Sequence, residues 1–172
     1  MNIRRLGAIS LAVLTGTTIA FAQKVTSDSD PAAPFATYRT YMWTAGTPSL
    51  EGLNEQRIHD GVDAQLAAKG LRKVASGADL VVATHVKTQQ QRELISDGFG
   101  YGAWWGAGPI ASVQTYVTGM LIVDLYDAHT KKMVWRGTAT DTVSGKPSKN
   151  AERINKGLSK MFTRYPIVSA AN

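Results

Sequence analysis

The fold is decided by residues 113–143, whose sequence is VQTYVTGMLIVDLYDAHTKKMVWRGTATDTV. Large aliphatic residues occupy alternate odd positions of its first half: Val117, Leu121, Val123 and Leu125. Because successive side chains of a strand point to opposite faces, Val113–Tyr126 is predicted to be a strand with one apolar face. The segment 127–131 has the composition of a turn, and Lys132–Val143 alternates again, which together predict a β-hairpin.

Two further strands and two helices are predicted around this hairpin. Phe35–Trp43 is rich in aromatic residues and threonines, and Ala78–Gln89 is apolar on both faces near its start, so both segments favour strands. Leu50–Lys69 is predicted to be a helix because large aliphatic residues recur along one face, and Gly70 is its expected end. A second apolar stripe predicts another helix over residues 148–165.

These elements predict a single α+β domain over residues 35–166, in the order β-α-β-loop-β-β-α. We expect a two-layer sandwich, in which a mainly antiparallel four-stranded sheet carries both helices on one face. If the first two strands are parallel neighbours, the helix between them makes a right-handed crossover. Residues 167–172 are expected to form a tail.

The first 22 residues have the pattern of a secretory signal peptide. Arg4-Arg5 provides a basic start, Leu6–Ile19 is uncharged and mostly apolar, and Ala20-Phe21-Ala22 places small residues where a signal peptidase requires them. We predict cleavage after Ala22, a flexible leader over residues 23–34, and a periplasmic or secreted mature chain with no transmembrane span. The alternative is a membrane anchor that stays in place, although the apolar run is short for a bilayer.

Charge and cysteine content exclude several classes of function. The chain has Lys+Arg 19 and Asp+Glu 13, a net charge of +6, and removal of the two signal-peptide arginines leaves 17 against 13, or +4. In an exported chain, this mild and dispersed basic charge gives no reason to expect nucleic acid as a partner. The absence of cysteine excludes disulfides and thiolate metal sites. Gln23 stands where a lipobox requires cysteine, so no lipid anchor is expected.

The most unusual composition lies in the segment 97–112. Five glycines and four aromatic residues occur within residues 98–109, and no charged residue occurs between Asp97 and Asp124. The four aromatic residues are the candidate binding residues: Phe99, Tyr101, Trp104 and Trp105. Two interpretations are open. The segment either covers an open face of the sheet or forms a docking surface for an envelope protein, a glycan or a membrane surface.

No recognisable catalytic or metal-binding pattern occurs in the chain. It contains no Gly-x-Ser-x-Gly, no His-Glu-x-x-His and no phosphate-binding loop, and its three histidines lack ligand spacing. His59 and Asp63 lie four residues apart on one predicted helix and are interpreted as a solvated surface pair. We therefore expect no enzyme activity, no metal and no cofactor. The alternative is a hydrolase of envelope polymers that uses carboxylates such as Asp97 and Asp124.

Five short segments occur in a fixed order along the chain: Tyr41-Met42-Trp43, Ala78-Asp79-Leu80-Val81-Val82, Gly119-Met120-Leu121-Ile122-Val123-Asp124 with Asp127, Val134-Trp135-Arg136-Gly137, and Met161-Phe162-Thr163-Arg164-Tyr165-Pro166. In this order they resemble the bacterial envelope family known as domain of unknown function 4136, over residues 35–166. The resemblance implies an exported α+β domain, often lipidated, with no assigned activity and no catalytic residues. This chain departs from the lipidated members by lacking the cysteine. The function expected from the sequence is a non-enzymatic binding module of the cell envelope.

Overall fold

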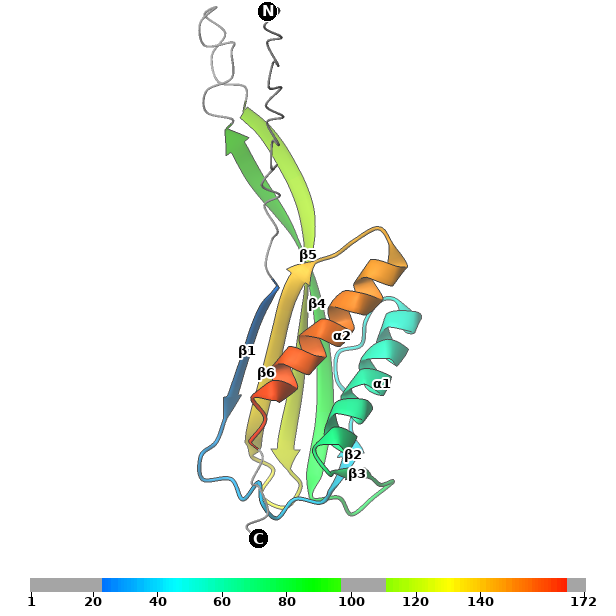
Figure 1. The fold of residues 1–172 in the computed structure, drawn as a ribbon, viewed down its shortest axis with the longest axis vertical. Helices are drawn as coiled ribbons and strands as arrows, with labels where there is room; N and C mark the ends of the chain where they lie inside the picture. Colours follow the sequence, from blue (N-terminus) through cyan, green and yellow to red (C-terminus); the bar gives the residue numbers. More distant parts are fainter. Residues whose placement is uncertain (1–22, 97–110, 167–172) are drawn as a thin grey trace, which may run out of the picture.

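The computed structural model describes residues 23–96 and 111–166 of the chain (Figure 1). The strands in this part are β1 (Lys24–Ser29), β2 (Thr40–Trp43), β3 (Arg72–Lys73), β4 (Leu80–Ser96), β5 (Ala111–Asp127) and β6 (Met133–Thr142). The helices are α1 (Gly52–Ala68), between β2 and β3, and α2 (Pro147–Thr163), after β6. The predicted α+β class is confirmed.

The strands form one mixed six-stranded sheet in the spatial order β1-β6-β5-β4-β2-β3. β1, β6, β5 and β4 are antiparallel neighbours, whereas β2 pairs in parallel with both β4 and β3. The prediction of a four-stranded sheet was therefore wrong in strand number, because neither β1 nor β3 was expected. The parallel pairing considered for the first two predicted strands is present between β2 and β4.

Residues 24–29 belong to the sheet and are not the flexible leader that the sequence predicted. β1 pairs with β6 along its whole length, from Lys24 opposite Thr140 to Ser29 opposite Trp135. Val25 is the only large apolar residue of this segment, so its alternation carries little hydrophobic signal. The strand forms because β6 would otherwise expose a row of unpaired backbone donors and acceptors.

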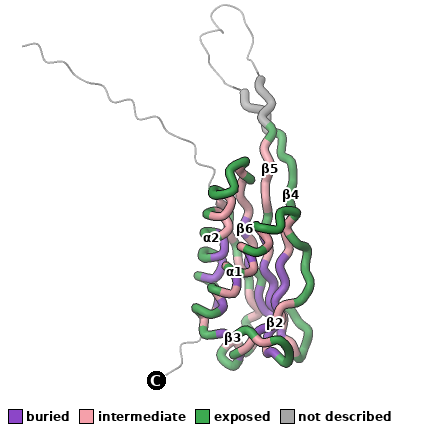
Figure 2. The backbone as a smooth tube through the Cα atoms, turned by 90° about the vertical axis from the view of Figure 1, so that its right-hand side faces the viewer, coloured by how far each residue is buried: buried purple, intermediate pink, exposed green. Residues whose placement is uncertain are grey.

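Both helices cover the same face of the sheet, as expected (Figure 1). Figure 2 shows the buried parts of the sheet facing the helices. The core between the two layers consists of large apolar side chains: Ile58, Val62, Leu66, Leu80, Val82, Val123, Leu125, Trp135, Leu158, Met161 and Phe162. Burial of each large aliphatic side chain contributes about 1.5–3 kcal/mol before entropy is counted. The apolar stripes predicted on the two helices are therefore the surfaces that hold the layers together.

The two helices run in the same direction and begin at the same end of the sandwich (Figure 1). α1 ends where expected, since Gly70 has a positive φ of 83°, which favours glycine. α2 begins with Pro147, whose missing N–H is not needed in the first turn of a helix. Both helix N-termini consequently lie at one end of the domain, and both helix C-termini at the other.

β4 and β5 extend beyond the other strands as a two-stranded ribbon (Figure 1). They pair from Leu80 opposite Asp127 to Ser96 opposite Ala111. β2 stops at the register of Val82, and β6 at the register of Thr118. The side chains of residues 87–92 are exposed, in accord with their polar sequence. Residues 97–110, which connect the two strands, lie outside the described residues.

Candidate functional site

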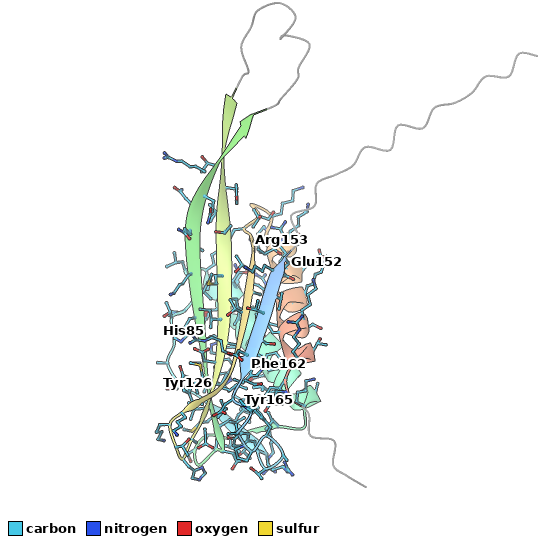
Figure 3. The ribbon with its side chains drawn as sticks, turned by 90° about the vertical axis from the view of Figure 1, so that its left-hand side faces the viewer. His85, Tyr126, Glu152, Arg153, Phe162 and Tyr165 are labelled. Atoms are coloured by element: carbon cyan, nitrogen blue, oxygen red, sulfur yellow. The ribbon has the colours of Figure 1, made fainter. Side chains whose placement is uncertain are left out.

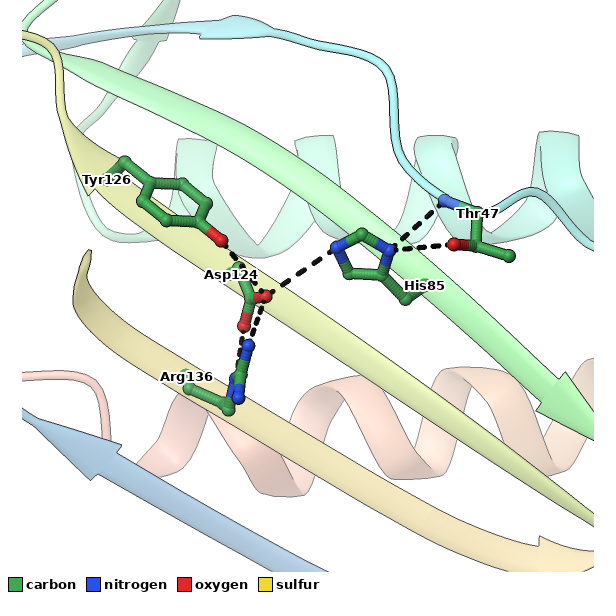
Figure 4. Close-up of polar contacts among 5 residues, drawn as sticks. All are labelled: Thr47, His85, Asp124, Tyr126 and Arg136. Atoms are coloured by element: carbon green, nitrogen blue, oxygen red, sulfur yellow. Dashed lines mark hydrogen bonds and ion pairs between the residues drawn. The ribbon is translucent and has the colours of Figure 1, made fainter. Parts of the chain in front are cut away.

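A carboxylate is fully buried on the sheet face that the helices leave uncovered. The Asp124 side chain has no exposed area, and Arg136 lies opposite it in the register of β5 and β6. The guanidinium donates two hydrogen bonds to this carboxylate, 2.6 Å from Nε to Oδ1 and 2.7 Å from Nη2 to Oδ2. The hydroxyl of Tyr126 donates a longer one of 3.5 Å to Oδ2 (Figure 4). The hydrogen bonds to Asp124 raise the pKa of Arg136 above its ordinary value.

His85 on β4 connects this ion pair to the loop that precedes α1 (Figure 4). Its Nε2 lies 3.7 Å from Oδ2 of Asp124, and its Nδ1 lies 3.1 Å from the backbone nitrogen and 3.0 Å from Oγ1 of Thr47. Since a backbone N–H can only donate, Nδ1 is an acceptor, and the proton of the neutral imidazole is on Nε2, facing Asp124. Thr47 also exchanges backbone hydrogen bonds with β4. The cluster thus fastens this loop to the sheet.

The cluster contains the residue types of a catalytic triad without the geometry of one. A triad needs a base nitrogen that is free to take the proton of the nucleophile. The Nδ1 of His85 already accepts from the N–H of Thr47, the residue whose hydroxyl would be the nucleophile. Within residues 23–96 and 111–166, the hydrogen-bond and ion-pair partners of Asp124 include no second carboxylate. Asp97, the other acid considered for a hydrolase, lies outside the described residues.

A second polar network connects α1 to β2 and β3. Oδ1 of Asp63 accepts hydrogen bonds of 2.8 Å from the Tyr41 hydroxyl and from Nε1 of Trp43, and Oδ2 accepts one of 2.9 Å from Lys73. Burial acts to raise the pKa of Asp63, but these donors outweigh it and lower the pKa below the ordinary value. His59 stacks on Trp43 with ring centroids 4.0 Å apart. Trp43 therefore contacts both His59 and Asp63, and His59 also lies 3.0 Å from Glu55. Both residues have structural partners, so the prediction of a solvated pair was wrong.

Two further aspartates of the motif segments stabilise loops at the end of the sheet opposite the ribbon. Asp79 accepts hydrogen bonds from the backbone nitrogens of Arg39 and Thr40, which lower its pKa. Asp127 accepts from the backbone of Thr130 and from the hydroxyl of Tyr38, and its pKa is lowered to about 2, chiefly by the Thr130 bond. These motif aspartates therefore have structural roles.

A groove opens between the sheet and the helices at the end where the helices begin and the ribbon extends. We call it the apical groove, and its volume is about 470 Å³. Its apolar lining comes from β4, β5, β6 and both helices: Val86, Val117, Leu121, Ala139, Ile58 and Ile154. Gly119 also lines it, and a Cβ added there would meet a single atom within 4 Å, Cγ2 of Val143, in a tight contact of 3.1 Å. Ligand sites commonly have volumes of about 300–1,000 Å³, so the apical groove is large enough for a small ligand.

The mouth of the apical groove exposes apolar side chains. Leu50 is 95% exposed and Val143 is 37% exposed, and both line the groove. Arg153, on the first half of α2, provides a polar edge (Figure 3). Its guanidinium donates to the carbonyl of Thr142 and lies 3.8 Å from Asp141. The arrangement, apolar inside with polar groups at the edge, is typical of a site that binds a partly apolar molecule.

The candidate residues predicted from the sequence, Phe99, Tyr101, Trp104 and Trp105, lie outside the described residues. The apical groove was missed because strands, helices and a loop that are distant in sequence contribute to it. One signal was available in Gly119, which removes a side chain from the apolar face of a long strand. Among the described residues, no group of three or more His, Cys, Asp or Glu side chains could hold a metal ion. No helix of that part of the chain is long and apolar enough to cross a membrane.

The fold and its motif residues define an α+β domain in which a mixed sheet carries two parallel helices on one face. The chain belongs to the family described as Domain of unknown function (DUF4136), whose model matches residues 25–167. The match begins within β1, in agreement with the place of that strand in the sheet. No curated protein matches the chain.

Solved structures with similar folds have low sequence identity to this chain. A PDZ domain protein from Parabacteroides distasonis is 12% identical with a TM-score of 0.55, and the match covers 86% of this chain and 37% of that protein. A dodecamer of a PelC variant from Paraburkholderia phytofirmans is 19% identical with a TM-score of 0.48, covering 83% and 99%. Lipoprotein GNA1162 from Neisseria meningitidis is 10% identical with a TM-score of 0.43, covering 73% and 98%. At these identities a match shows the fold alone, and of these three structures the Parabacteroides protein has a TM-score above 0.5.

Proposed function

We propose that this chain is an exported, non-enzymatic binding protein of the bacterial cell envelope, with the apical groove as its ligand site. The observation that carries the proposal is the groove itself, about 470 Å³ of mostly apolar space between the sheet and the first halves of both helices. The size suits a small ligand or part of a larger one. The exposed Leu50 and Val143 at the mouth support an apolar occupant.

Export is supported by the N-terminal sequence. The basic start, the apolar run and the small residues up to Ala22 are those of a secretory signal peptide. The expected mature chain therefore begins at Gln23 and resides in the periplasm or is secreted. Mass spectrometry of the protein purified from the envelope fraction tests this proposal, since an intact N-terminus there would contradict cleavage.

A binding role is favoured over a hydrolytic one by the partners of the polar groups. The charge of Asp124 is balanced by Arg136, which donates two hydrogen bonds to it. Nδ1 of His85 already accepts a hydrogen bond from the backbone N–H of Thr47. The apical groove contains two acids, Glu51 and Asp141, but Asp141 lies beside Arg153 and Glu51 accepts a hydrogen bond from Asn54. Each of these groups has a local partner, which supports structural roles for them.

The proposal is tested with a neutral apolar dye, N-phenyl-1-naphthylamine, whose fluorescence rises in apolar surroundings. The variant Gly119→Leu places a side chain in the groove, and the one atom within 4 Å of its added Cβ belongs to the partly exposed Val143 side chain. The matched control is Thr140→Leu, which adds leucine to the uncovered face opposite Met120. We expect saturable binding that is lost in Gly119→Leu and kept in Thr140→Leu. Equal binding by all three proteins would contradict the proposal.

The aromatic segment is a separate candidate contact surface, supported by its composition alone. Four aromatic residues and five glycines within residues 98–109 favour contact with an envelope protein, a glycan or a membrane surface. The double variant Trp104→Ala/Trp105→Ala is expected to unfold cooperatively like the parent and to lose partners captured from envelope extract. Loss of cooperative unfolding would instead make these residues part of the core.

A further inference from the structure

The lining of the apical groove restricts the class of its ligand. Among the described residues that line it, none is Phe, Tyr, Trp or His, and its apolar surface is aliphatic. Sugars and nucleobases are usually held by stacking on aromatic rings, which these residues do not supply. An aliphatic groove of this volume instead suits a flexible hydrocarbon chain, whose contacts are non-directional.

The two sides of the groove mouth differ in charge. On α2, residues 150, 153, 154 and 157 line the groove. Lys149 lies one turn before Arg153 on the same helix face, and Lys146 is the N-cap residue, whose carbonyl accepts a hydrogen bond from the N–H of Asn150. Both lysines are exposed, and the first turn of α2 has no acidic residue. On the α1 side, the charged lining residue is Glu51. Asp141 of β6 also lines the groove and lies 3.8 Å from Arg153, so these two charges offset each other. The remaining charges make the mouth basic beside α2, at Lys146 and Lys149, and acidic beside α1, at Glu51.

Resting on the function proposed above, we propose that the apical groove binds the acyl chain of a single-chain anionic lipid. The hydrocarbon chain occupies the aliphatic groove, and the anionic headgroup lies on the α2 side, near Lys146 and Lys149. Charge complementarity selects this side, because Glu51 repels an anion from the other. The volume of about 470 Å³ is near the lower end of the range for ligand sites and therefore favours one acyl chain over two.

The experiment compares three single-chain lipids that carry the same acyl chain, used below their critical micelle concentrations. They are an anionic lysophosphatidylglycerol, a zwitterionic lysophosphatidylcholine and a neutral monoacylglycerol, each displacing N-phenyl-1-naphthylamine from the full-length mature protein. We expect the anionic lipid to displace the dye at about fivefold lower concentration than the neutral one, the effect of two exposed charge contacts. The variant Lys146→Gln/Lys149→Gln is expected to abolish that preference and leave monoacylglycerol displacement unchanged.

The matched control removes the same charge at the opposite end of the sandwich. Lys69, at the end of α1, and Lys132, before β6, are distant from the groove mouth, so Lys69→Gln/Lys132→Gln should keep the preference. Dye binding that Gly119→Leu abolishes, without a preference for the anionic lipid, overturns this inference and leaves the proposed function standing. An equal loss of preference in both double variants also overturns it, because the preference would then depend on the net charge of the protein and not on the position of the lysines. Absence of any dye binding overturns both proposals.

Discussion

Asp124 and Arg136 form a two-point ion pair across β5 and β6, with hydrogen bonds of 2.6 and 2.7 Å, on the face of the sheet that no helix covers. The Arg136 side chain is 46% exposed, and the Asp124 side chain is fully buried. The guanidinium thus shields an acid that would otherwise face solvent, and His85 extends the cluster to Thr47. The cluster therefore joins β4, β5 and β6 to the loop of Thr47, which lines part of the apical groove.

Arg136→Leu is expected to lower the free energy of unfolding by about 2–3 kcal/mol, because it leaves a buried carboxylate without its counter-charge. The loss is smaller than for a fully buried pair because the Arg136 side chain is 46% exposed. The double variant Asp124→Val/Arg136→Leu should recover most of that loss, since no charge then remains buried. Urea denaturation of both proteins measures the difference. Lys87→Leu, an exposed basic residue of the same face, is the control. A single variant as stable as the parent would contradict a structural role for the pair.

Gly46→Ala is expected to disturb the loop that borders the apical groove. A Cβ at this position would lie 2.0 Å from the carbonyl oxygen of Thr84, so the backbone must shift. We expect a loss of about 1–3 kcal/mol in unfolding free energy and weaker dye binding. Gly145→Ala is the matched control, because no atom lies within 4 Å of its added Cβ. Unchanged stability and dye affinity in Gly46→Ala would contradict a role of this loop in stability and in the shape of the apical groove.

Stability is expected to fall as the pH drops from near 4 toward 2. The ordinary pKa of an aspartate is 3.8, whereas that of folded Asp127 is about 2. Between these values the unfolded chain binds a proton that the folded chain does not, so lowering the pH favours unfolding. The pKa values of Asp63 and Asp79 are also lowered, which acts in the same direction.

Asp127→Asn tests this pH dependence. It keeps an acceptor for the backbone of Thr130 and removes the titrating proton. Denaturation curves at several pH values should show a smaller decrease of stability between pH 3.8 and about 2 than in the parent protein. An identical pH profile for the two proteins would mean that Asp127 does not contribute to acid unfolding.

The strongly periodic parts of the fold could be predicted from the sequence. Alternation over residues 113–143 predicted the β5–β6 hairpin, and the stripe of Ile58, Val62 and Leu66 predicted the buried face of α1. These patterns exist because one face of each element is buried in the core. β1 has no such pattern, since its pairing with β6 is mainly a matter of backbone hydrogen bonds. Local sequence could not predict that pairing.

The polar and apolar sites depended on long-range contacts and were harder to predict. Asp124 was noticed as a possible catalytic acid, but its pairing with Arg136 follows from strand register, which the sequence did not specify. The apical groove is lined by the first halves of α1 and α2 together with Gly119 of β5, so its shape depends on how the helices pack on the sheet. A groove lined by several separate elements has no local sequence signature. The binding surface predicted from the sequence was therefore the aromatic segment 97–112.

Methyl NMR of the mature protein, titrated with lysophosphatidylglycerol below its critical micelle concentration, tests the central claim most directly. The groove methyl groups of Ile58, Val86 and Ile154 are expected to shift in a saturable way. The methyl groups of Val134, buried near the opposite end of β6, should not shift. Saturable shifts confined to the groove would support a lipid-binding site between the sheet and the helices. Shifts that are absent from the groove methyl groups, or equal throughout the domain, would contradict it.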